Sequence, residues 1–308
     1  MKIGFIGLGT MGRGIAANIL KAEHGLAVYD INKAAADELL EAGASWADSP
    51  KSLAEGVEIV FSSLPRPSDV IDVYEGGNGL SAGLAAGKIW FDLSTNSVET
   101  VRKLHAELST RGVRFLDAPV SGGPAGAASG QLAVWVGGDR AAFDRARPVL
   151  DTFSDHARYV GEIGAGSIAK LVHNLTATVM MQAIAEGMTI GVKAGLEPLQ
   201  LYEALRAGAT GRARSFDSIH RRWLPENLDP ASFQLSLLHK DVKLAVEMAR
   251  QVGVPSRLSQ LALEDMTEAL NRGWGARDAQ SVLLLQQERA GLGSFGLTQK
   301  AIDDVMKE

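Results

Sequence analysis

The segment Gly7–Gly12 constrains the fold of this chain more than any other feature of its sequence. It follows the apolar run Ile3–Ile6 and precedes a helix-like segment that extends to Leu20. Glycines at this spacing between a strand and a helix are typical of a dinucleotide-binding unit, because they allow a tight turn, close approach of a pyrophosphate and close helix–strand packing. The helix N-terminus also offers unpaired N–H groups to the anion. Against the alternative of a glycine-rich turn without a ligand, we predict dinucleotide contacts at Gly7, Leu8, Gly9, Thr10, Met11 and Gly12.

Apolar runs alternate with helix-length amphipathic segments up to about residue 150, and from Gly164 onward the apolar positions recur at helical spacing. Continuous apolar strands separated by helices are typical of a mainly parallel sheet covered on both faces. We therefore predict an α/β fold: an N-terminal Rossmann-type doubly wound parallel sheet (residues 1–162), then an all-α C-terminal domain for substrate binding and oligomerisation (163–308), joined by a long interdomain helix. The expected strands are Ile3–Ile6, Leu26–Tyr29, Ile59–Leu64, Ile89–Leu93, Phe115–Leu116 and Leu132–Val136, and the expected helices after Gly164 are 164–194, 197–207, 236–252, 256–271 and 278–290.

The composition excludes several kinds of partner and site. The net charge is −5 and the basic residues are mostly scattered, so we expect no nucleic-acid partner. The chain has no cysteine, which excludes disulfides and fits a reducing cytoplasm. No group of histidines and carboxylates has metal-ligand spacing, so we expect no metal. The apolar run Leu171–Ile190 carries His173, Asn174 and Glu186, which are expensive in a bilayer, so we expect a buried helix and no membrane partner.

Asp30 ends the second apolar run, 18 positions after Gly12. A carboxylate at this distance binds the ribose hydroxyls of NAD and repels the 2′-phosphate of NADP, so we predict NAD over NADP. Ile31 and Asn32 follow Asp30 and are expected beside the same cofactor, while Lys33 would soften the discrimination. The alternative is that Asp30 only caps a helix.

Two later strand ends also suggest contacts to the cofactor, because ligands in open α/β sheets lie beyond the carboxyl ends of the strands. Leu64 and Pro65 end one run, and we expect Pro65 and Pro67 to rigidify a wall over the adenosine. Ser94 and Thr95 end the next run and offer hydroxyls near the nicotinamide ribose. Loop capping is the alternative for each of them.

The tripeptide Ser121-Gly122-Gly123 follows a further run. It combines a hydroxyl with backbone amides that no side chain shields, which suits a bound carboxylate. A simple glycine turn is the alternative.

Four motifs occur in the order seen in one enzyme family: Gly7–Gly12, Asp117–Gly123, Gly164–Asn174 and Lys240-Asp241. Over nearly its whole length the chain thus resembles the β-hydroxyacid dehydrogenases, which include 3-hydroxyisobutyrate dehydrogenase and tartronate semialdehyde reductase. The resemblance implies a small carboxylate-bearing substrate and a homo-oligomer, either a dimer or a tetramer. It also implies a catalytic Lys170, substrate contacts at Asn174 and at Ser121, Gly122 and Gly123, and positions near the cofactor for Thr95 and Lys240.

The residues around Lys170 suit a proton-transferring amine. Lys170 and Asn174 are four positions apart and share one face of the expected helix, and Gly166 is expected to leave space one turn earlier. Oxidation of an alcohol requires loss of its proton as the hydride leaves. An amine accepts that proton when burial and nearby positive charge lower its pKa. The alternative is an ordinary solvent-facing lysine.

Three features depart from the family pattern or are unusual. His173 stands where the family commonly has an asparagine, and we interpret it as a packed or capped helix residue, with a catalytic role as the alternative. The family's usual proline after the serine/threonine pair is replaced in the segment 92–97, where we expect Ser97 to cap the following helix. The third feature is a group of arginines that either holds a second carboxylate or phosphate of the substrate or is solvated or at an interface. Its members are Arg212, Arg214, Arg221 and Arg222.

Together these observations predict an oxidoreductase that transfers a hydride between NAD(H) and the alcohol or carbonyl carbon of a small, 3-hydroxyisobutyrate-like β-hydroxy acid or its semialdehyde. An imine reductase of the same architecture is one alternative, which Lys170 disfavours because that branch typically replaces the lysine. A non-catalytic NAD-binding sensor is the other. The individual acid stays open, since one methylene changes selectivity by only about 1–3 kcal/mol.

Overall fold

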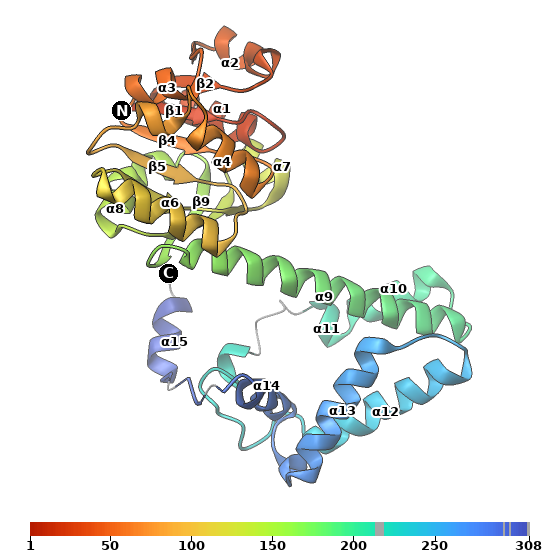
Figure 1. Cartoon of the computed structure of the whole chain (residues 1–308). Helices are drawn as coiled ribbons and strands as arrows, with labels where there is room; N and C mark the ends of the chain where they lie inside the picture. The colour runs from red at the N-terminus through yellow and green to blue at the C-terminus, as the bar shows by residue number, and fades with distance from the viewer. Residues whose placement is uncertain (213–218, 292, 296, 307–308) are drawn as a thin grey trace. The chain divides into compact units, whose positions relative to one another are not determined.

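The computed structural model describes the chain apart from residues 213–218, 292, 296 and 307–308, and apart from the side chains of some further helical residues, Lys240 among them. The chain divides into two compact units, Met1–Thr176 and Ala177–Glu308. The boundary falls inside the long helix α9 (Ala165–Lys193), which begins in the first unit and continues in the second (Figure 1).

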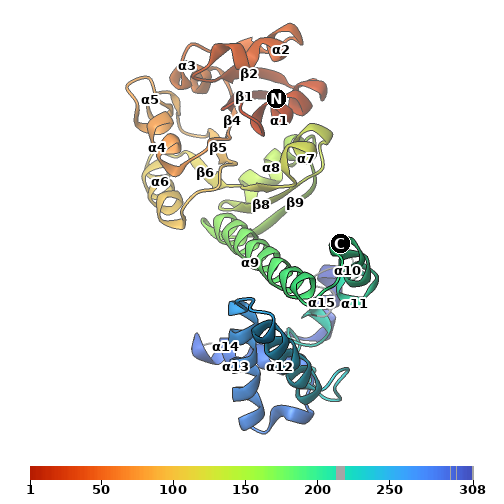
Figure 2. The ribbon, with the colours of Figure 1, turned by 90° about the vertical axis from the view of Figure 1, so that its right-hand side faces the viewer.

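A nine-stranded sheet forms the centre of the first unit (Figure 2). All neighbouring strands from β3 to β6 run parallel, whereas β8 is antiparallel to β6 and β7 and parallel to β9. The predicted mainly parallel sheet is therefore confirmed. In spatial order the strands are β3 (Ser45–Trp46), β2 (Gly25–Tyr29), β1 (Lys2–Ile6), β4 (Ile59–Ser62), β5 (Ile89–Asp92), β6 (Arg114–Asp117), β8 (Leu132–Gly137) and β7 (Val120–Ser121), with β9 (Ser154–Gly161) beside β8.

Helices cover both faces of this sheet because alternate strand residues point to opposite sides. Phe5, Phe61 and Phe91 line up on one face, with successive ring centroids 6.5 and 5.2 Å apart, while Val60 and Trp90 belong to the core of the other face. The first face is covered by α1 (Gly12–Lys21), α2 (Asp37–Glu41), α7 (Gly123–Ser129) and α8 (Arg140–Leu150), and the second by α3 (Pro50–Gly56), α4 (Pro67–Glu75), α5 (Leu80–Gly83) and α6 (Val98–Thr110).

In the described residues of the second unit, helices joined by loops are the regular elements, and one isolated bridge joins Gln234 and Asp278. This confirms the predicted all-α domain. Its core includes Leu235, Met266 and Leu285. The elements after α9 are α10 (Pro198–Ala207), α11 (Ala209–Arg212), η2 (Ile219–Arg221), α12 (Leu235–Gln251), α13 (Arg257–Asn271), η3 (Trp274–Ala276), η4 (Ala279–Val282), α14 (Leu283–Arg289) and α15 (Gln299–Met306). None of the helices in the described part of the chain has the length and apolar character needed to cross a membrane.

Candidate cofactor and substrate site

The glycine turn joins β1 to α1, and its three glycines meet different surroundings. Gly7 has φ +91°, and a Cβ atom on Gly7 or on Gly12 would overlap backbone oxygen atoms of Ser63 or Gly7. A Cβ on Gly9 would meet no protein atom within 4 Å. The fold itself thus requires Gly7 and Gly12, whereas Gly9 leaves open space for a ligand. No side chain caps the N-terminus of α1, which fits an anion bound there.

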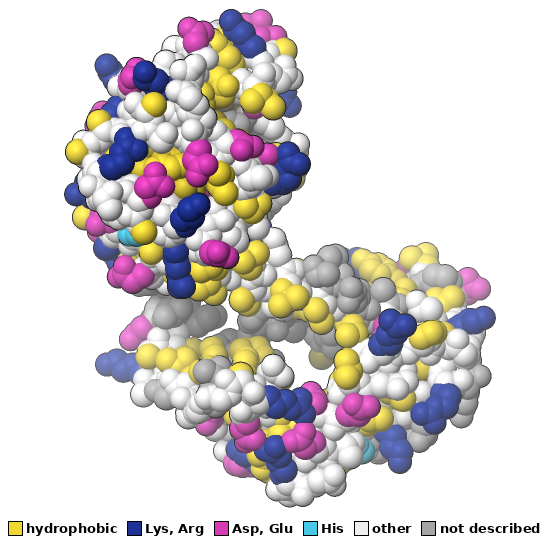
Figure 3. Space-filling view, in the orientation of Figure 1, with side chains coloured by type: hydrophobic (Ala, Val, Ile, Leu, Met, Phe, Trp, Pro, Cys, Tyr) yellow, Lys and Arg dark blue, Asp and Glu magenta, His cyan; other side chains and the backbone are white. Residues whose placement is uncertain are grey.

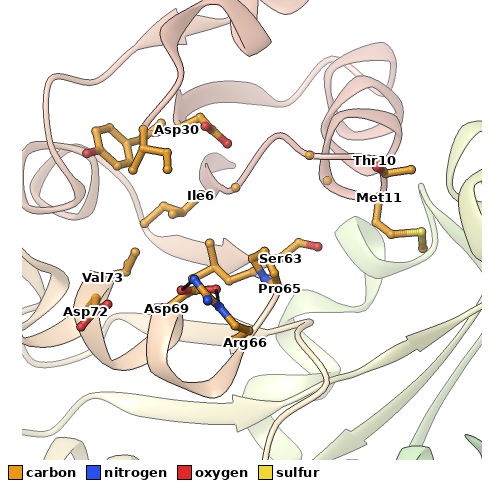
Figure 4. Close-up of a pocket in the computed structure, with 16 residues that line it drawn as sticks. Ile6, Thr10, Met11, Asp30, Ser63, Pro65, Arg66, Asp69, Asp72 and Val73 are labelled. Carbon is orange, nitrogen blue, oxygen red and sulfur yellow. Dashed lines mark hydrogen bonds and ion pairs between the residues drawn. The ribbon is translucent and has the colours of Figure 1, made fainter.

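A cavity of about 580 Å³ opens beyond the carboxyl ends of β1, β2 and β4 (Figure 4). In this position a parallel sheet binds its ligands. The predicted cofactor residues that line it are Gly7, Gly9, Thr10, Met11, Gly12, Asp30, Ile31, Leu64 and Pro65.

Two backbone hydrogen bonds hold Asp30 beside the glycine turn. Its Oδ2 atom accepts a hydrogen bond from the backbone N–H of Leu8, with an N···O distance of 2.6 Å. Its Oδ1 atom accepts one from the backbone N–H of Asn32 at 2.8 Å. The neighbouring Ile31 also lines the cavity, yet 94% of its surface is exposed. Lys33, at the start of the 3₁₀ helix η1 (Lys33–Ala36), lies with its Nζ atom 5.4 Å from the ring centre of Trp46.

The opposite wall of the cavity carries charged residues that the sequence did not single out. Arg66 precedes α4, and its Nε and Nη2 atoms donate to the two carboxylate oxygens of Asp69 at 3.1 and 2.9 Å. Asp72 and Val73 follow on the same helix and line the same cavity (Figure 4). The signal in the sequence was the repeat of proline on either side of Arg66, which we related to rigidity alone.

Ser94 and Thr95 lie at the end of β5. The hydroxyl of Ser94 accepts the backbone N–H of Leu64 at 2.9 Å, which ties the ends of β4 and β5 together, while Thr95 is exposed. Below them the buried carboxylate of Asp92 accepts hydrogen bonds from the Ser62 hydroxyl and the Asn96 amide at 3.0 and 3.1 Å. Burial raises the pKa of Asp92, and its hydrogen bonds oppose that shift.

The start of α9 is fixed to the sheet by Asp117 at the end of β6. Its Oδ1 atom accepts the backbone N–H of Gly164 at 2.8 Å, and its Oδ2 atom accepts that of Ser167 at 2.6 Å. The expectation that Gly166 leaves space next to Lys170 was wrong, because a Cβ at Gly166 would overlap the carbonyl oxygen of Trp135 and lie 2.6 Å from that of Asp117. The missing side chain lets the backbone of the sheet approach the helix.

Lys170 lies half-buried on the first turns of α9. Burial lowers the pKa of its amine, and no hydrogen bond or ion pair engages this amine in the described part of the chain. One turn later the Nε2 atom of His173 lies 3.2 Å from the hydroxyl oxygen of Ser121, and its ring packs 5.2 Å from that of Trp135. His173 thus contacts Trp135 and Ser121 although the residue is exposed, and its role stays a prediction.

The His173–Ser121 contact joins the two predicted substrate segments within one unit. Lys170 and Asn174 lie on α9, whereas Ser121 ends β7 and is followed by Gly122 and Gly123 at the start of α7. Gly122 has φ +134°, a conformation that side chains disfavour, and a Cβ on Gly123 would meet open space.

Some predicted residues are not brought to this site by any described contact. The side chain of Lys240 and the whole of Arg214 lie outside the described residues. Arg222 donates to the carbonyl oxygen atoms of Asn227 and Pro230 at 3.2 and 2.9 Å, so it supports its own loop. Arg212 and Arg221 lie exposed on the second unit. Among the described residues, no group of three or more histidines and carboxylates has the arrangement of a metal site.

Comparisons with known proteins agree with this geometry. Residues 2–161 match the NAD binding domain of 6-phosphogluconate dehydrogenase, and residues 164–285 match the NAD-binding domain of NADP-dependent 3-hydroxyisobutyrate dehydrogenase. The NAD-dependent L-serine dehydrogenase of Pseudomonas aeruginosa is 38% identical over 285 residues, which span 90% of this chain and 95% of that protein.

The chain belongs to the β-hydroxyacid dehydrogenase family. A solved 3-hydroxyisobutyrate dehydrogenase of Mycobacterium tuberculosis, studied with L-serine, is 29% identical with a TM-score of 0.64 and covers 93% of this chain and 99% of its own. A reductive aminase of Aspergillus terreus has a TM-score of 0.77 at 19% identity, covering 92% and 98% of the two chains, and so shares the fold alone. This β-hydroxyacid dehydrogenase is a nicotinamide-dependent oxidoreductase that acts on hydroxyl groups of hydroxy acids.

Proposed function

We propose that this dehydrogenase reversibly oxidises the hydroxyl group of a small β-hydroxy acid with NAD, and that Lys170 transfers the proton. The observation that carries the proposal is the half-buried Lys170 amine, whose pKa is lowered by burial, on a helix tied by His173 to the Ser121–Gly123 segment. Bound NAD supplies the hydride acceptor.

Lys170 acts as general base in the oxidative direction. Its neutral amine accepts the hydroxyl proton of the substrate while the carbon of that hydroxyl gives up its hydride. In the reverse direction its ammonium donates the proton to the developing alkoxide. The desolvation that lowers the pKa of Lys170 supports this exchange, because it makes the neutral amine accessible closer to neutral pH.

The carboxylate of the substrate binds at Ser121, Gly122 and Gly123 in this proposal. The Ser121 hydroxyl donates to it, and the open side of Gly123 leaves room for it. Asn174, four positions after Lys170 on α9, orients the reacting hydroxyl or the lysine.

The preference for NAD follows from Asp30. Two backbone N–H groups beside the glycine turn donate hydrogen bonds to its carboxylate, and Asp30 lines the cavity. There the carboxylate would accept hydrogen bonds from the ribose hydroxyls of NAD and repel the 2′-phosphate of NADP. Thr10 and Met11 at the start of α1, and Thr95 after β5, complete the cofactor contacts, with Lys240 contributing from α12. We propose no metal in this reaction, because the amine alone provides the acid–base chemistry.

We further propose that the enzyme assembles as a homo-oligomer, a dimer or tetramer. Helix α10 exposes Leu199, Tyr202 and Leu205 at a spacing of three, which places them along one side of the helix, with Leu199 67% exposed. Hydrophobic side chains, drawn in yellow, lie at the surface over the region of α9 and α10 in Figure 3. Exposure of such an apolar stripe to water is unfavourable, and a second copy of the chain would bury it. Light scattering on the wild type and on Leu199→Glu tests this, with a smaller particle expected for the variant. The cytoplasmic location stays a prediction.

The decisive experiment is a panel of small hydroxy acids assayed with NAD and with NADP, followed at the absorbance of the reduced nicotinamide. The panel contains 3-hydroxyisobutyrate, glycerate, threonate, serine and 4-hydroxybutyrate. Turnover of at least one acid with NAD is expected. Turnover of imines alone, in a parallel assay with NADH or NADPH, would contradict the proposal in favour of an imine reductase. Binding of NADH without turnover of any acid or imine would contradict it in favour of a sensor.

A further inference from the structure

The arginine that lines the cofactor cavity and the lysine three positions after Asp30 both have partners already. Among the described residues that line the cavity, Arg66 is the one cation, and Asp69 occupies the edge of its guanidinium with two parallel hydrogen bonds. Lys33 lies over the ring of Trp46. A guanidinium binds phosphate through the same edge that it offers to a carboxylate. Asp69 therefore competes directly with any phosphate for Arg66.

The local backbone builds this pair. Arg66 stands between Pro65 and Pro67 with φ −135° and ψ 154°, the extended conformation that a following proline favours. Pro67 starts α4, so Asp69 lies in the first turn, and its backbone N–H donates to the carbonyl of Arg66 at 3.0 Å. The Arg66 guanidinium lowers the pKa of Asp69, which keeps the pair ionised at neutral pH.

We propose that the Arg66–Asp69 pair is a second determinant of cofactor specificity: Asp69 holds Arg66 away from a 2′-phosphate, so that the cavity retains the unphosphorylated ribose of NAD. This inference rests on the proposed function and adds to the role of Asp30 there. In Figure 4 Asp30 comes from one side of the cavity and the Arg66–Asp69 pair from the other, so the two act on a ligand from different elements.

Removal of Asp69 releases a cation into the cavity without unfolding the protein. The Arg66 side chain is 74% exposed and that of Asp69 21%, so the ion pair lies at the surface on its arginine side, and ion pairs at the surface contribute little to stability. Once freed, this long side chain can turn toward a phosphate in the same cavity. One new charge-assisted hydrogen bond at a partly exposed site corresponds to about a ten-fold change in affinity.

The test measures equilibrium binding of the two cofactors without their nicotinamide, ADP-ribose and 2′-phospho-ADP-ribose, to the full chain by titration calorimetry. The variants are Asp69→Asn, Arg66→Ala and the double variant, with Asp72→Asn as the matched control that removes one charge from the same cavity and helix. We expect Asp69→Asn to tighten 2′-phospho-ADP-ribose about ten-fold relative to ADP-ribose. This gain should vanish in the double variant, and Asp72→Asn should give a clearly smaller one.

Three results would overturn the inference: no gain in Asp69→Asn, an equal gain in the Arg66→Ala background, or an equal gain in Asp72→Asn. The last two results would mean that any loss of negative charge from the cavity favours the 2′-phosphate, without a contribution from Arg66. Asp69→Ser, a smaller neutral replacement, provides the same comparison if the asparagine variant does not fold. If the wild type binds neither ADP-ribose nor NADH, the proposed function fails instead, so the two failures are distinct.

Discussion

The carboxylate of Asp117 accepts the backbone N–H of Ser167 in a hydrogen bond of 2.6 Å, three positions before Lys170. Asp117 ends β6, and Ser167 lies in the first turn of α9, so one carboxylate sets where the long helix starts against the sheet. Since Lys170 follows on the next turn, the position of its amine depends on the hydrogen bonds between Asp117 and the start of α9. Gly166 is the residue that lets the two backbones meet.

Gly166→Ala is therefore expected to disturb both stability and catalysis. The added methyl would overlap the carbonyl of Trp135, which we expect to cost about 1–3 kcal/mol in the free energy of unfolding. A shift of the helix start by about 1 Å is expected to lower kcat by about 10²-fold. Denaturant unfolding and steady-state kinetics provide the measurements.

Gly187→Ala is the matched control for Gly166→Ala. Gly187 lies in the same helix, but its Cβ would meet open space, so alanine is expected to leave the stability unchanged or raise it by up to about 1 kcal/mol. Equal effects of the two substitutions would show that the close contact at Gly166 is unimportant.

Much of the fold could be predicted because its strands are apolar on both faces. The runs at β1, β4 and β5 are buried at nearly every position, so hydrophobicity alone reveals them. Strand β9 was missed because its residues are largely polar and only Ser154 and Ala157 are buried. Such an edge strand is set by pairing with β8, which its own sequence does not encode.

The candidate site could be predicted in part for a similar reason. Asp30 and the glycine turn follow a spacing that is local in sequence, and the structure places them around one cavity. The contact between Ser121 and His173 joins residues 52 positions apart, and no periodicity predicts which two segments meet. Arg66 and Asp69 are close in sequence, but their role appears only once the cavity beside them is known.

Gly9→Ala separates ligand binding from folding. Because no protein atom lies within 4 Å of the added Cβ, we expect the free energy of unfolding to change by less than about 0.5 kcal/mol. The same methyl would occupy the space of the pyrophosphate, and NADH affinity is expected to fall at least about ten-fold. Fluorescence titration with NADH and denaturant unfolding measure the two effects.

Gly12→Ala is the contrast to Gly9→Ala, since its Cβ would overlap the carbonyl of Gly7. We expect it to destabilise the protein by about 1–3 kcal/mol. Unchanged NADH binding in a folded Gly9→Ala variant would contradict the placement of the pyrophosphate at this turn.

Asp30→Asn is expected to relax the choice of cofactor. The amide keeps one oxygen for the N–H of Leu8 or Asn32 but removes the charge that repels a 2′-phosphate. We expect the ratio of kcat/KM with NADP to that with NAD to rise about ten-fold. Asp37→Asn, an exposed carboxylate at the start of α2 that does not line the cavity, is the control. A wild type that prefers NADPH to NADH would refute the role of Asp30 outright.

Lys170→Ala and Lys170→Arg test the proton transfer itself. Alanine removes the base, and arginine keeps the positive charge but does not lose its proton near neutral pH. Both variants are expected to lower kcat by about 10²–10⁴-fold while NADH still binds with nearly the affinity of the wild type. A folded, NADH-binding Lys170→Ala variant with the kcat of the wild type would remove Lys170 from the mechanism.

The pH dependence gives an independent measure of the same amine. Burial lowers the pKa of Lys170, so the oxidative reaction, which needs the neutral amine, should rise with pH and level off with an inflection below about 10.4, the value of a free lysine. The reductive reaction needs the ammonium and should fall as the pH rises through the corresponding pKa of its own complex. The free energy of unfolding is also expected to rise with pH in this range. Between the lower pKa of Lys170 in the folded chain and its higher pKa in the unfolded chain, the unfolded chain binds more protons, so a rise in pH favours the folded state. Rate profiles in both directions for the wild type, with His173→Asn as a control that leaves Lys170 in place, check the assignment. Loss of the inflection of the oxidative reaction in the His173→Asn variant would identify the imidazole, and not the amine of Lys170, as the base.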